Sequence, residues 1–127
     1  MIDWKVLIER ASQAQSNAYA RYSNFSVGAA ILGQNGEIFA GCNVENSSYG
    51  LTNCAERTAV FSAVSEGVKD FRALVVISDS KSPAKPCGAC RQVLYEFSPQ
   101  LEILCINNAG QRENFLLSDL FPEGFKL

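Results

Sequence analysis

Apolar positions follow two different rhythms in the first third of the chain. From Asp3 to about Tyr19 they recur at intervals of three and four residues, which predicts an amphipathic helix with Asp3 as its N-cap. Residues 26–32 and 37–43 are instead strand-length runs on either side of Asn35-Gly36, a dipeptide typical of type I′ hairpin turns. The chain is therefore expected to open with a helix and an antiparallel hairpin.

Helical and strand patterns alternate through the rest of the chain, and Gly67 and Ser98-Pro99 act as stop signals for helices. The run from 71 to 78 is continuously apolar, which is typical of a strand that is covered on both faces. The predicted elements are helices at 55–66 and 88–97, strands at 71–78, 101–106 and 113–117, and a short helical turn that begins at 118.

These elements predict a three-layer α/β/α domain with a five-stranded mixed sheet, and residues 1–127 as a single domain. The strand–helix–strand–helix–strand order between residues 37 and 106 implies right-handed crossovers and a parallel centre. Gly28, Ala29 and Ala30 are small for strand residues, so we expect a helix or a ligand to pack closely on that strand.

The composition narrows the classes of function. With 127 residues, of which 47% are hydrophobic and 19% charged, the chain is typical of a globular domain. A net charge of -2 and the lack of a basic run argue against binding to nucleic acid. No apolar run is long enough to span a bilayer and no leader-like segment opens the chain, so we expect a cytoplasmic protein without a membrane partner.

Five cysteines and no histidine indicate a metal site or reactive thiols, and argue against a disulfide framework. Cys87 and Cys90 open one predicted helix, and Cys54 opens another. Free backbone N–H groups and the helix dipole at such ends favour thiolates. If the two helix ends meet, three thiolates can hold one zinc ion and leave a fourth position for water, which is the mark of a catalytic site.

Glu56 and Arg57 add a carboxylate and a positive charge to this site. Glu56 can approach the sulfur of Cys54 only if Cys54 lies at the helix cap, and there it could move a proton between water and a substrate nitrogen. Zinc with three thiolates carries a net charge of about -1. We therefore expect Arg57 or Arg91 to donate hydrogen bonds to the sulfurs, with a surface ion pair as the alternative for each.

Other interpretations of the cysteines remain open. Cys42 or Cys105 could supply a fourth ligand and make the site structural, although a strand end and a core strand favour small buried side chains at these positions. Cys87 and Cys90 alone could form a redox pair.

The motifs together resemble the cytidine deaminase family, specifically its small homotetrameric branch with three cysteine ligands. An x-x-E segment followed by P-C-x-x-C is the general signature of zinc deaminases. The resemblance extends over nearly the whole chain, through the segments Tyr22–Ala30, Gly41–Asn46, Cys54–Ala59, Pro86–Gln92 and Leu120–Phe125. The chain departs from the family pattern at Ser47-Ser48, Lys85 and Phe121, and none of these is a proposed ligand.

The resemblance implies that Cys54, Cys87 and Cys90 hold one Zn²⁺ per chain and that Glu56 moves the protons, with Arg57 behind the ligands. It implies the following substrate contacts: Asn43 and Glu45 to the ribose hydroxyls, Phe25 to the sugar and base, the backbone of Ala55 to the pyrimidine carbonyl, and Tyr49 and Phe125 to the site of a neighbouring subunit.

The implied activity is hydrolytic deamination of cytidine and 2′-deoxycytidine in pyrimidine salvage, by a homotetramer with shared active sites. The nearest alternative is the same chemistry on another cytosine-like amine such as blasticidin S, against which the pair Asn43 and Glu45 argues. A deaminase of polynucleotides fits the acidic charge balance less well, and a structural zinc module or a thiol redox protein are the alternatives from other classes.

Overall fold

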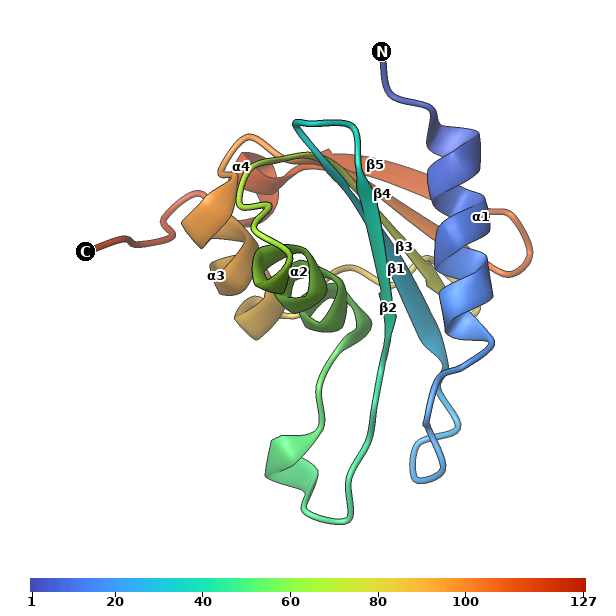
Figure 1. The fold of residues 1–127 in the computed structure, drawn as a ribbon. Helices are drawn as coiled ribbons and strands as arrows, with labels where there is room; N and C mark the ends of the chain where they lie inside the picture. Colours follow the sequence, from blue (N-terminus) through green and yellow to red (C-terminus); the bar gives the residue numbers. More distant parts are fainter.

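Five strands form one mixed sheet that lies between two layers of helices (Figure 1). The computed structural model describes all residues from 1 to 127. The elements in order are α1 (Trp4–Gln15), β1 (Val27–Gly33), β2 (Ile38–Cys42), the 3-10 turn η1 (Tyr49–Leu51), α2 (Ala55–Ser65), β3 (Phe71–Ser78), α3 (Gly88–Phe97), β4 (Glu102–Asn107), β5 (Arg112–Leu116) and α4 (Leu117–Leu120). The predicted α/β/α architecture with a five-stranded mixed sheet is confirmed. None of the helices combines the length and apolar character needed to cross a membrane.

The strand order is β2-β1-β3-β4-β5, and it corrects the predicted parallel centre. Only β3 and β4 are parallel neighbours, because β1 lies between β2 and β3 and is antiparallel to both. Every residue of β1 is buried, whereas β2 is mostly half-buried. The strand in the inner position, β1, is therefore covered on both faces, whereas β2 forms the edge of the sheet.

The hairpin turn is also different from the prediction. A type I′ turn needs positive φ at both central residues, but only Gly36 has a positive φ, of 88°. The Gly36 N–H donates to the Gly33 carbonyl at 3.0 Å, and the Gly33 N–H donates to the Glu37 carbonyl at 2.8 Å. The hairpin loop thus has three residues, 34–36, instead of two, and Gly36 takes the left-handed conformation at its last position.

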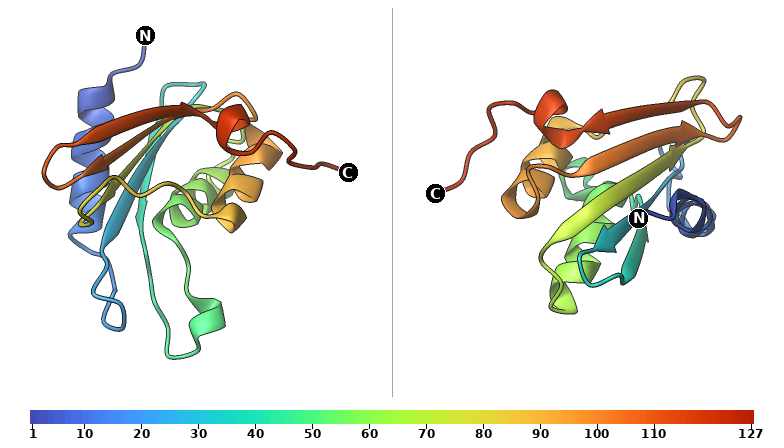
Figure 2. Two further views of the ribbon diagram at one scale, coloured as in Figure 1. Left: turned by 180° about the vertical axis from the view of Figure 1, so that it is seen from behind. Right: turned by 90° about the horizontal axis from the view of Figure 1, so that it is seen from above.

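Helix α1 covers one face of the sheet alone (Figure 2). The Asp3 carboxylate caps the helix by accepting a hydrogen bond from the Val6 N–H at 3.3 Å. The helix ends at Gln15, earlier than predicted, because the Ser16 hydroxyl bonds the Gln13 carbonyl and competes with the helical pattern. A Cβ at Gly28 would lie 2.0 Å from the Ala11 carbonyl oxygen, so the predicted close packing on β1 comes from this helix.

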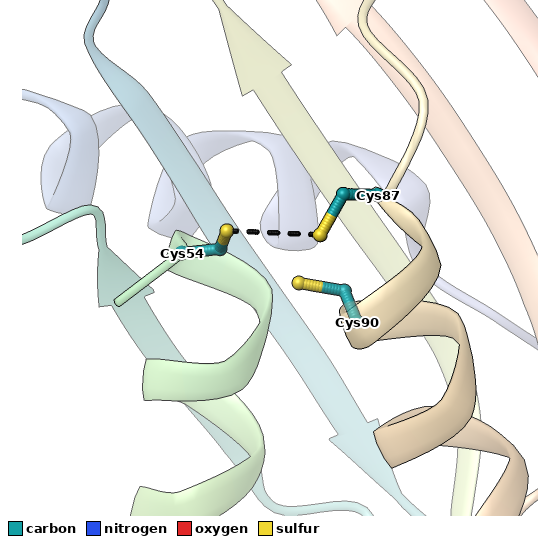
Figure 3. A group of neighbouring side chains, drawn as sticks. All are labelled: Cys54, Cys87 and Cys90. Carbon is teal, nitrogen blue, oxygen red and sulfur yellow. Dashed lines mark hydrogen bonds between the residues drawn. The ribbon is translucent and has the colours of Figure 1, made fainter. Parts of the chain in front are cut away.

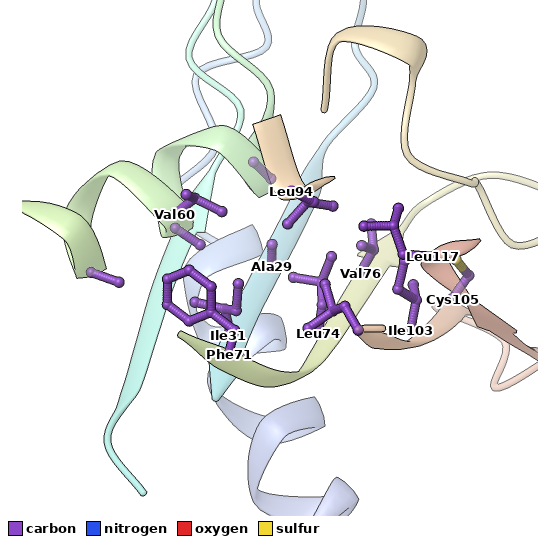
Figure 4. Close-up of a cluster of buried hydrophobic side chains, with 14 of the residues drawn as sticks. Ala29, Ile31, Val60, Phe71, Leu74, Val76, Leu94, Ile103, Cys105 and Leu117 are labelled. Carbon is purple, nitrogen blue, oxygen red and sulfur yellow. The ribbon is translucent and has the colours of Figure 1, made fainter. Parts of the chain in front are cut away.

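Helices α2, α3 and α4 cover the opposite face over the larger part of the core (Figure 4). Val60 of α2, Leu94 of α3 and Leu117 of α4 pack there against the central strands. Helix α2 approaches β2 closely at Gly41, where a Cβ would lie 2.6 Å from the backbone nitrogen of Ala59. Both helices that carry the predicted cysteine ligands therefore lie on one face of the sheet.

We expect Gly28→Ala to destabilise the protein by about 1–3 kcal/mol, because the added methyl group forces α1 away from β1. Denaturant unfolding of the zinc-loaded protein measures this change. Gly50→Ala is the control, since a Cβ at Gly50 meets no atom within 4 Å. An unfolding midpoint of Gly28→Ala equal to that of the unsubstituted protein would contradict the packing described here.

Candidate functional site

Three cysteine sulfurs converge where α2 and α3 begin (Figure 3). Cys54 is the N-cap of α2, and Cys87 is the N-cap of α3, with Cys90 in the first turn of the same helix. The Sγ atoms of Cys54 and Cys87 lie 3.9 Å apart, and all three sulfurs lie within 4.8 Å of one another. No histidine, aspartate, glutamate or further cysteine joins this cluster.

The cluster fits a zinc ion in both chemistry and dimensions. Tetrahedral zinc with bonds of about 2.3 Å to sulfur places two thiolates about 3.8 Å apart, close to the separation of Cys54 and Cys87. All five cysteines are free thiols. Cys42 and Cys105 lie outside the cluster, so three protein ligands leave one coordination position open. An open position is typical of a catalytic zinc site.

Arg57 lies against the sulfurs and favours their charged form. One of its Nη atoms donates to the Sγ of Cys54 at 3.1 Å, and its buried Nε–H has no partner. A hydrogen bond from Cys90 and the Arg57 guanidinium together lower the pKa of Cys54 to about 5. Two helix N-termini add further positive potential at the same point. This chain therefore stabilises thiolate at Cys54 before any metal binds.

Glu56 is a buried carboxyl group in the first turn of α2, with 5% of its surface exposed. Cys54 has the extended cap conformation, with φ -76° and ψ 155°, so its side chain departs from the helical direction and the two side chains are brought to the same side. Burial, and next the negative charge of Cys54, raise the pKa of Glu56 to about 7. A carboxyl group with such a pKa can both accept and donate a proton near neutral pH.

A cavity of about 290 Å³ opens beside these groups and holds most of the predicted site residues. Cys54, Ala55, Glu56 and Cys87 line the part of the cavity next to the sulfur cluster. Ala55 is the first residue of α2, where backbone N–H groups have no partner within the helix. Phe25, Asn43 and Glu45, for which the family resemblance implies contacts with a sugar, also line the cavity.

Asn43 and Glu45 hold the segment that carries Phe25. The Asn43 side chain accepts from the Val27 N–H at 2.9 Å and donates to the Phe25 carbonyl at 2.7 Å. One oxygen of Glu45 accepts from the Tyr22 and Ser23 N–H groups at 2.9 and 3.1 Å, and the other accepts from the Ser23 hydroxyl. These bonds, with that of the Ser23 hydroxyl first, lower the pKa of Glu45.

Tyr49 and Phe125 do not line this cavity. Tyr49 lines an adjoining hollow of about 320 Å³, in which its ring meets that of Tyr22 edge-on at 5.8 Å. Phe125 lies on the C-terminal segment beside α3, where its carbonyl accepts from the Gln92 side chain at 2.9 Å. Both rings are exposed, at 74% and 66%. Neither ring therefore forms part of the cavity wall within this chain.

Arg91 binds neither a sulfur nor an acidic partner, contrary to both expectations for it. Its Nε donates to the Pro86 carbonyl at 2.7 Å, and one Nη donates to the Leu120 carbonyl at 2.8 Å. Arg91 thus ties the segment before Cys87 to the end of α4.

Several cavity residues escaped the sequence analysis because nothing in their type indicates a site. Thr52 and Asn53 come from the loop before α2, Val76 from β3, and Ala84 and Lys85 from the loop before α3. Ser23 and Val27 are exceptions, because both line the cavity and lie within a segment on which the family resemblance rests. The hydroxyl of Ser23 also bonds Glu45.

Comparison with known proteins agrees with this geometry. The family model for the cytidine and deoxycytidylate deaminase zinc-binding region matches residues 1–110. A cytidine deaminase of Sporosarcina psychrophila is 47% identical over 125 residues, which cover 98% of this chain and 92% of the relative. A cytidine deaminase of Halalkalibacterium halodurans is 48% identical over 125 residues, which cover 98% and 95% of the two chains.

Solved structures give the same result. The crystal structure of cytidine deaminase from Burkholderia pseudomallei superposes with a TM-score of 0.93 at 48% identity, and the match covers 98% of this chain and 100% of that chain. The structure of the Mycobacterium tuberculosis cytidine deaminase gives a TM-score of 0.86 at 42% identity, with 100% of both chains covered.

We expect Cys54→Ser to lower the zinc content well below one ion per chain, because it removes one of three thiolate ligands. Elemental analysis of the purified protein measures this. Cys42→Ala, which removes a half-buried thiol outside the cluster, should keep one zinc per chain. Full zinc occupancy in Cys54→Ser would disprove the ligand set.

Proposed function

The chain belongs to the cytidine and deoxycytidylate deaminase family, and we propose that residues 1–127 form one catalytic domain that deaminates cytidine and 2′-deoxycytidine. The reaction consumes one water molecule and gives uridine or 2′-deoxyuridine plus ammonia. The observation that carries this proposal is the buried carboxyl of Glu56, which faces the same cavity as the zinc ligands Cys54 and Cys87.

Glu56 is the group that moves protons in this proposal. Zinc held by Cys54, Cys87 and Cys90 would supply the Lewis acid that makes a water molecule nucleophilic at neutral pH. Glu56 takes a proton from the water that attacks C4 of the pyrimidine and delivers it to N3. It then takes the remaining proton from the hydroxyl that attack has placed on C4 and carries it to the 4-amino nitrogen, so that the C4–N bond breaks, the C4=O bond forms and ammonia leaves. Its pKa of about 7 suits both directions of transfer.

Asn43 and Glu45 in the cavity wall have the free hydrogen-bonding capacity that a sugar diol needs. A carboxylate offers about four acceptor sites, and the loop around Ser23 uses three of those of Glu45. Asn43 likewise keeps one amide N–H and one oxygen lone pair. We propose that these groups bind the ribose hydroxyls, with Phe25 against the sugar and base. This arrangement favours a nucleoside over blasticidin S.

The Ala55 N–H is the proposed donor to the pyrimidine carbonyl. Ala55 has no exposed surface and lines the cavity at the start of α2, where its N–H is free of intrahelical bonds. A backbone donor at this point fixes the ring relative to Glu56 without a flexible side chain. Arg57 is proposed to act behind the ligands, by offsetting the charge of the thiolates.

We also propose that the enzyme works as a homotetramer in the cytoplasm, in pyrimidine salvage. Free thiols at Cys42 and Cys105 beside a thiolate zinc site suit a reducing compartment. Tyr49 and Phe125 are large, exposed aromatic residues outside their own subunit's cavity, which suits a role at the site of a neighbouring subunit.

We expect Glu56→Gln to retain zinc and to lower the turnover of cytidine by about 10²- to 10⁴-fold, because the amide cannot carry a proton. The ultraviolet spectrum follows conversion to uridine, and elemental analysis follows the metal. Glu66→Gln, which alters an exposed carboxylate at the end of the same helix, should behave like the unsubstituted enzyme. Turnover by Glu56→Gln at the normal rate would refute the proposed mechanism.

A mixing experiment tests whether Phe125 serves a neighbouring subunit. Phe125→Ala removes the ring but keeps the subunit's own Glu56, whereas Glu56→Gln keeps the ring. If sites are shared, co-refolded mixtures should recover several times the activity of either variant alone, with tetramers seen by sedimentation. Activity that never exceeds the weighted mean of the two variants would show that each subunit uses its own Phe125 or none.

A further inference from the structure

The segment from 79 to 86 leads from β3 to the zinc ligand Cys87 without any backbone–backbone hydrogen bond of its own. It has no helical or strand structure, and Pro83 and Pro86 cannot donate. Yet Ala84 and Lys85 form part of the cavity wall. Side chains from elsewhere must therefore hold this segment in place.

Two buried polar residues at the ends of neighbouring parallel strands perform this task. Ser78 ends β3 and Asn107 ends β4, and the two are partners in the sheet register. Their exposed fractions are 0% and 2%. Burying a hydroxyl and an amide between two helical layers is unfavourable unless each is fully hydrogen-bonded. Apolar residues would fill the same positions if packing alone mattered.

Ser78 starts a chain of hydroxyl bonds through the segment. The Ser80 hydroxyl donates to the Ser82 carbonyl at 2.6 Å, so it must accept from the Ser78 hydroxyl, which lies 2.7 Å away. The Ser78 oxygen in turn accepts from the Ala84 N–H at 3.4 Å. A single hydroxyl therefore fixes both the beginning of the segment and the residue that enters the cavity wall.

Asn107 holds the middle of the segment from the β4–β5 turn. Its amide nitrogen donates to the Lys81 carbonyl at 3.0 Å and to the Gln111 side chain at 2.7 Å. Its amide oxygen accepts from the Gln111 N–H at 2.9 Å. The amide thus bridges the segment to a hairpin that has its own ladder of hydrogen bonds.

We propose that Ser78 and Asn107 are positioning residues that hold residues 79–86 as the cavity wall and thereby place Cys87 for zinc. The consequence for turnover rests on the function proposed above, whereas the consequence for the metal does not. Arg91 fixes the far end of the segment at the Pro86 carbonyl, and the carboxylate of Asp79 accepts from the Ser26 N–H at 3.2 Å at its first residue. Loss of Ser78 or Asn107 therefore loosens residues 80–85 between these two points.

The test compares Ser78→Ala with Ser98→Ala. Both hydroxyls are buried and accept one backbone N–H bond, since Ser98 accepts from the Phe71 N–H at 2.9 Å. Ser98 lies beyond the end of α3, beside the first residue of β3, at the end of the sheet away from the cysteines. We expect Ser78→Ala to release zinc to a chromophoric chelator about tenfold faster. Hydrogen exchange of the Ala84 amide, whose N–H is the one backbone donor between 79 and 87 with a hydrogen-bond partner, should accelerate by a similar factor, the scale of one lost hydrogen bond.

Ser98→Ala should leave both readouts unchanged even if its melting temperature falls. The proposal is overturned if folded Ser78→Ala matches the unsubstituted protein in either readout, or if Ser98→Ala produces the same changes. Should Ser78→Ala not fold, Ser80→Ala takes its place, because Ser80 is only half-buried. We then expect about a threefold acceleration in both readouts. The absence of any acceleration in folded Ser80→Ala would overturn the proposal. Neither readout involves cytidine, so failure of the unsubstituted enzyme to turn cytidine over rejects only the proposed function.

Discussion

The site depends on one electrostatic constraint, which is that three thiolates must share a space less than 5 Å across. Such a cluster is stable only where positive charge surrounds it, and a bound zinc ion supplies two of the charges that are needed. The rest comes from the protein: the N-termini of α2 and α3 point at the sulfurs, and the Arg57 guanidinium donates to Cys54. A helix cap is therefore the one position from which a cysteine can serve both as ligand and as the start of the helix that stabilises it.

The sheet topology brings the two helix N-termini together. Strands β2 and β3 are both antiparallel to β1, so they run in the same direction. Their carboxyl ends therefore lie at the same end of the sheet, where β2 continues into the loop before α2 and β3 into the loop before α3. Both helices cover the same face. One intervening strand separates β2 from β3 by about 10 Å, which matches the 8–10 Å at which two helices pack. The position of β1 thus sets the distance at which Cys54 can meet Cys87 and Cys90.

The sequence predicted these elements well because each has a local cause. Asp3 caps α1, Gly67 ends α2 with a positive φ, and the apolar runs of β3 and β4 have no alternative to a buried sheet. The sequence could not predict features that depend on contacts between elements, such as which strand of the hairpin lies inside the sheet. The choice of β1 over β2 for the inner position depended on relative burial, and Asn35-Gly36 formed a different turn although the residues favour type I′. The family resemblance named Phe25, Asn43 and Glu45, which line the cavity, whereas Arg91 bonded two carbonyls for which the sequence gives no indication.

Two residues of the cavity wall, Asn43 and Glu45, also hold the neighbouring loop in its folded shape. Asn43 and Glu45 spend most of their hydrogen-bonding capacity on the segment that holds Phe25, and Asn24 within it has a positive φ of 56°. Among residues other than glycine, asparagine adopts that conformation most readily, and the bonds to the carboxylate and the amide hold the segment on either side of it. A substrate hydroxyl that takes the last free lone pair of Glu45 would complete a network that already exists. The groups that would bind a sugar are therefore the same groups that hold the loop in shape, so a substitution at either residue would alter both the cavity wall and its hydrogen-bonding capacity.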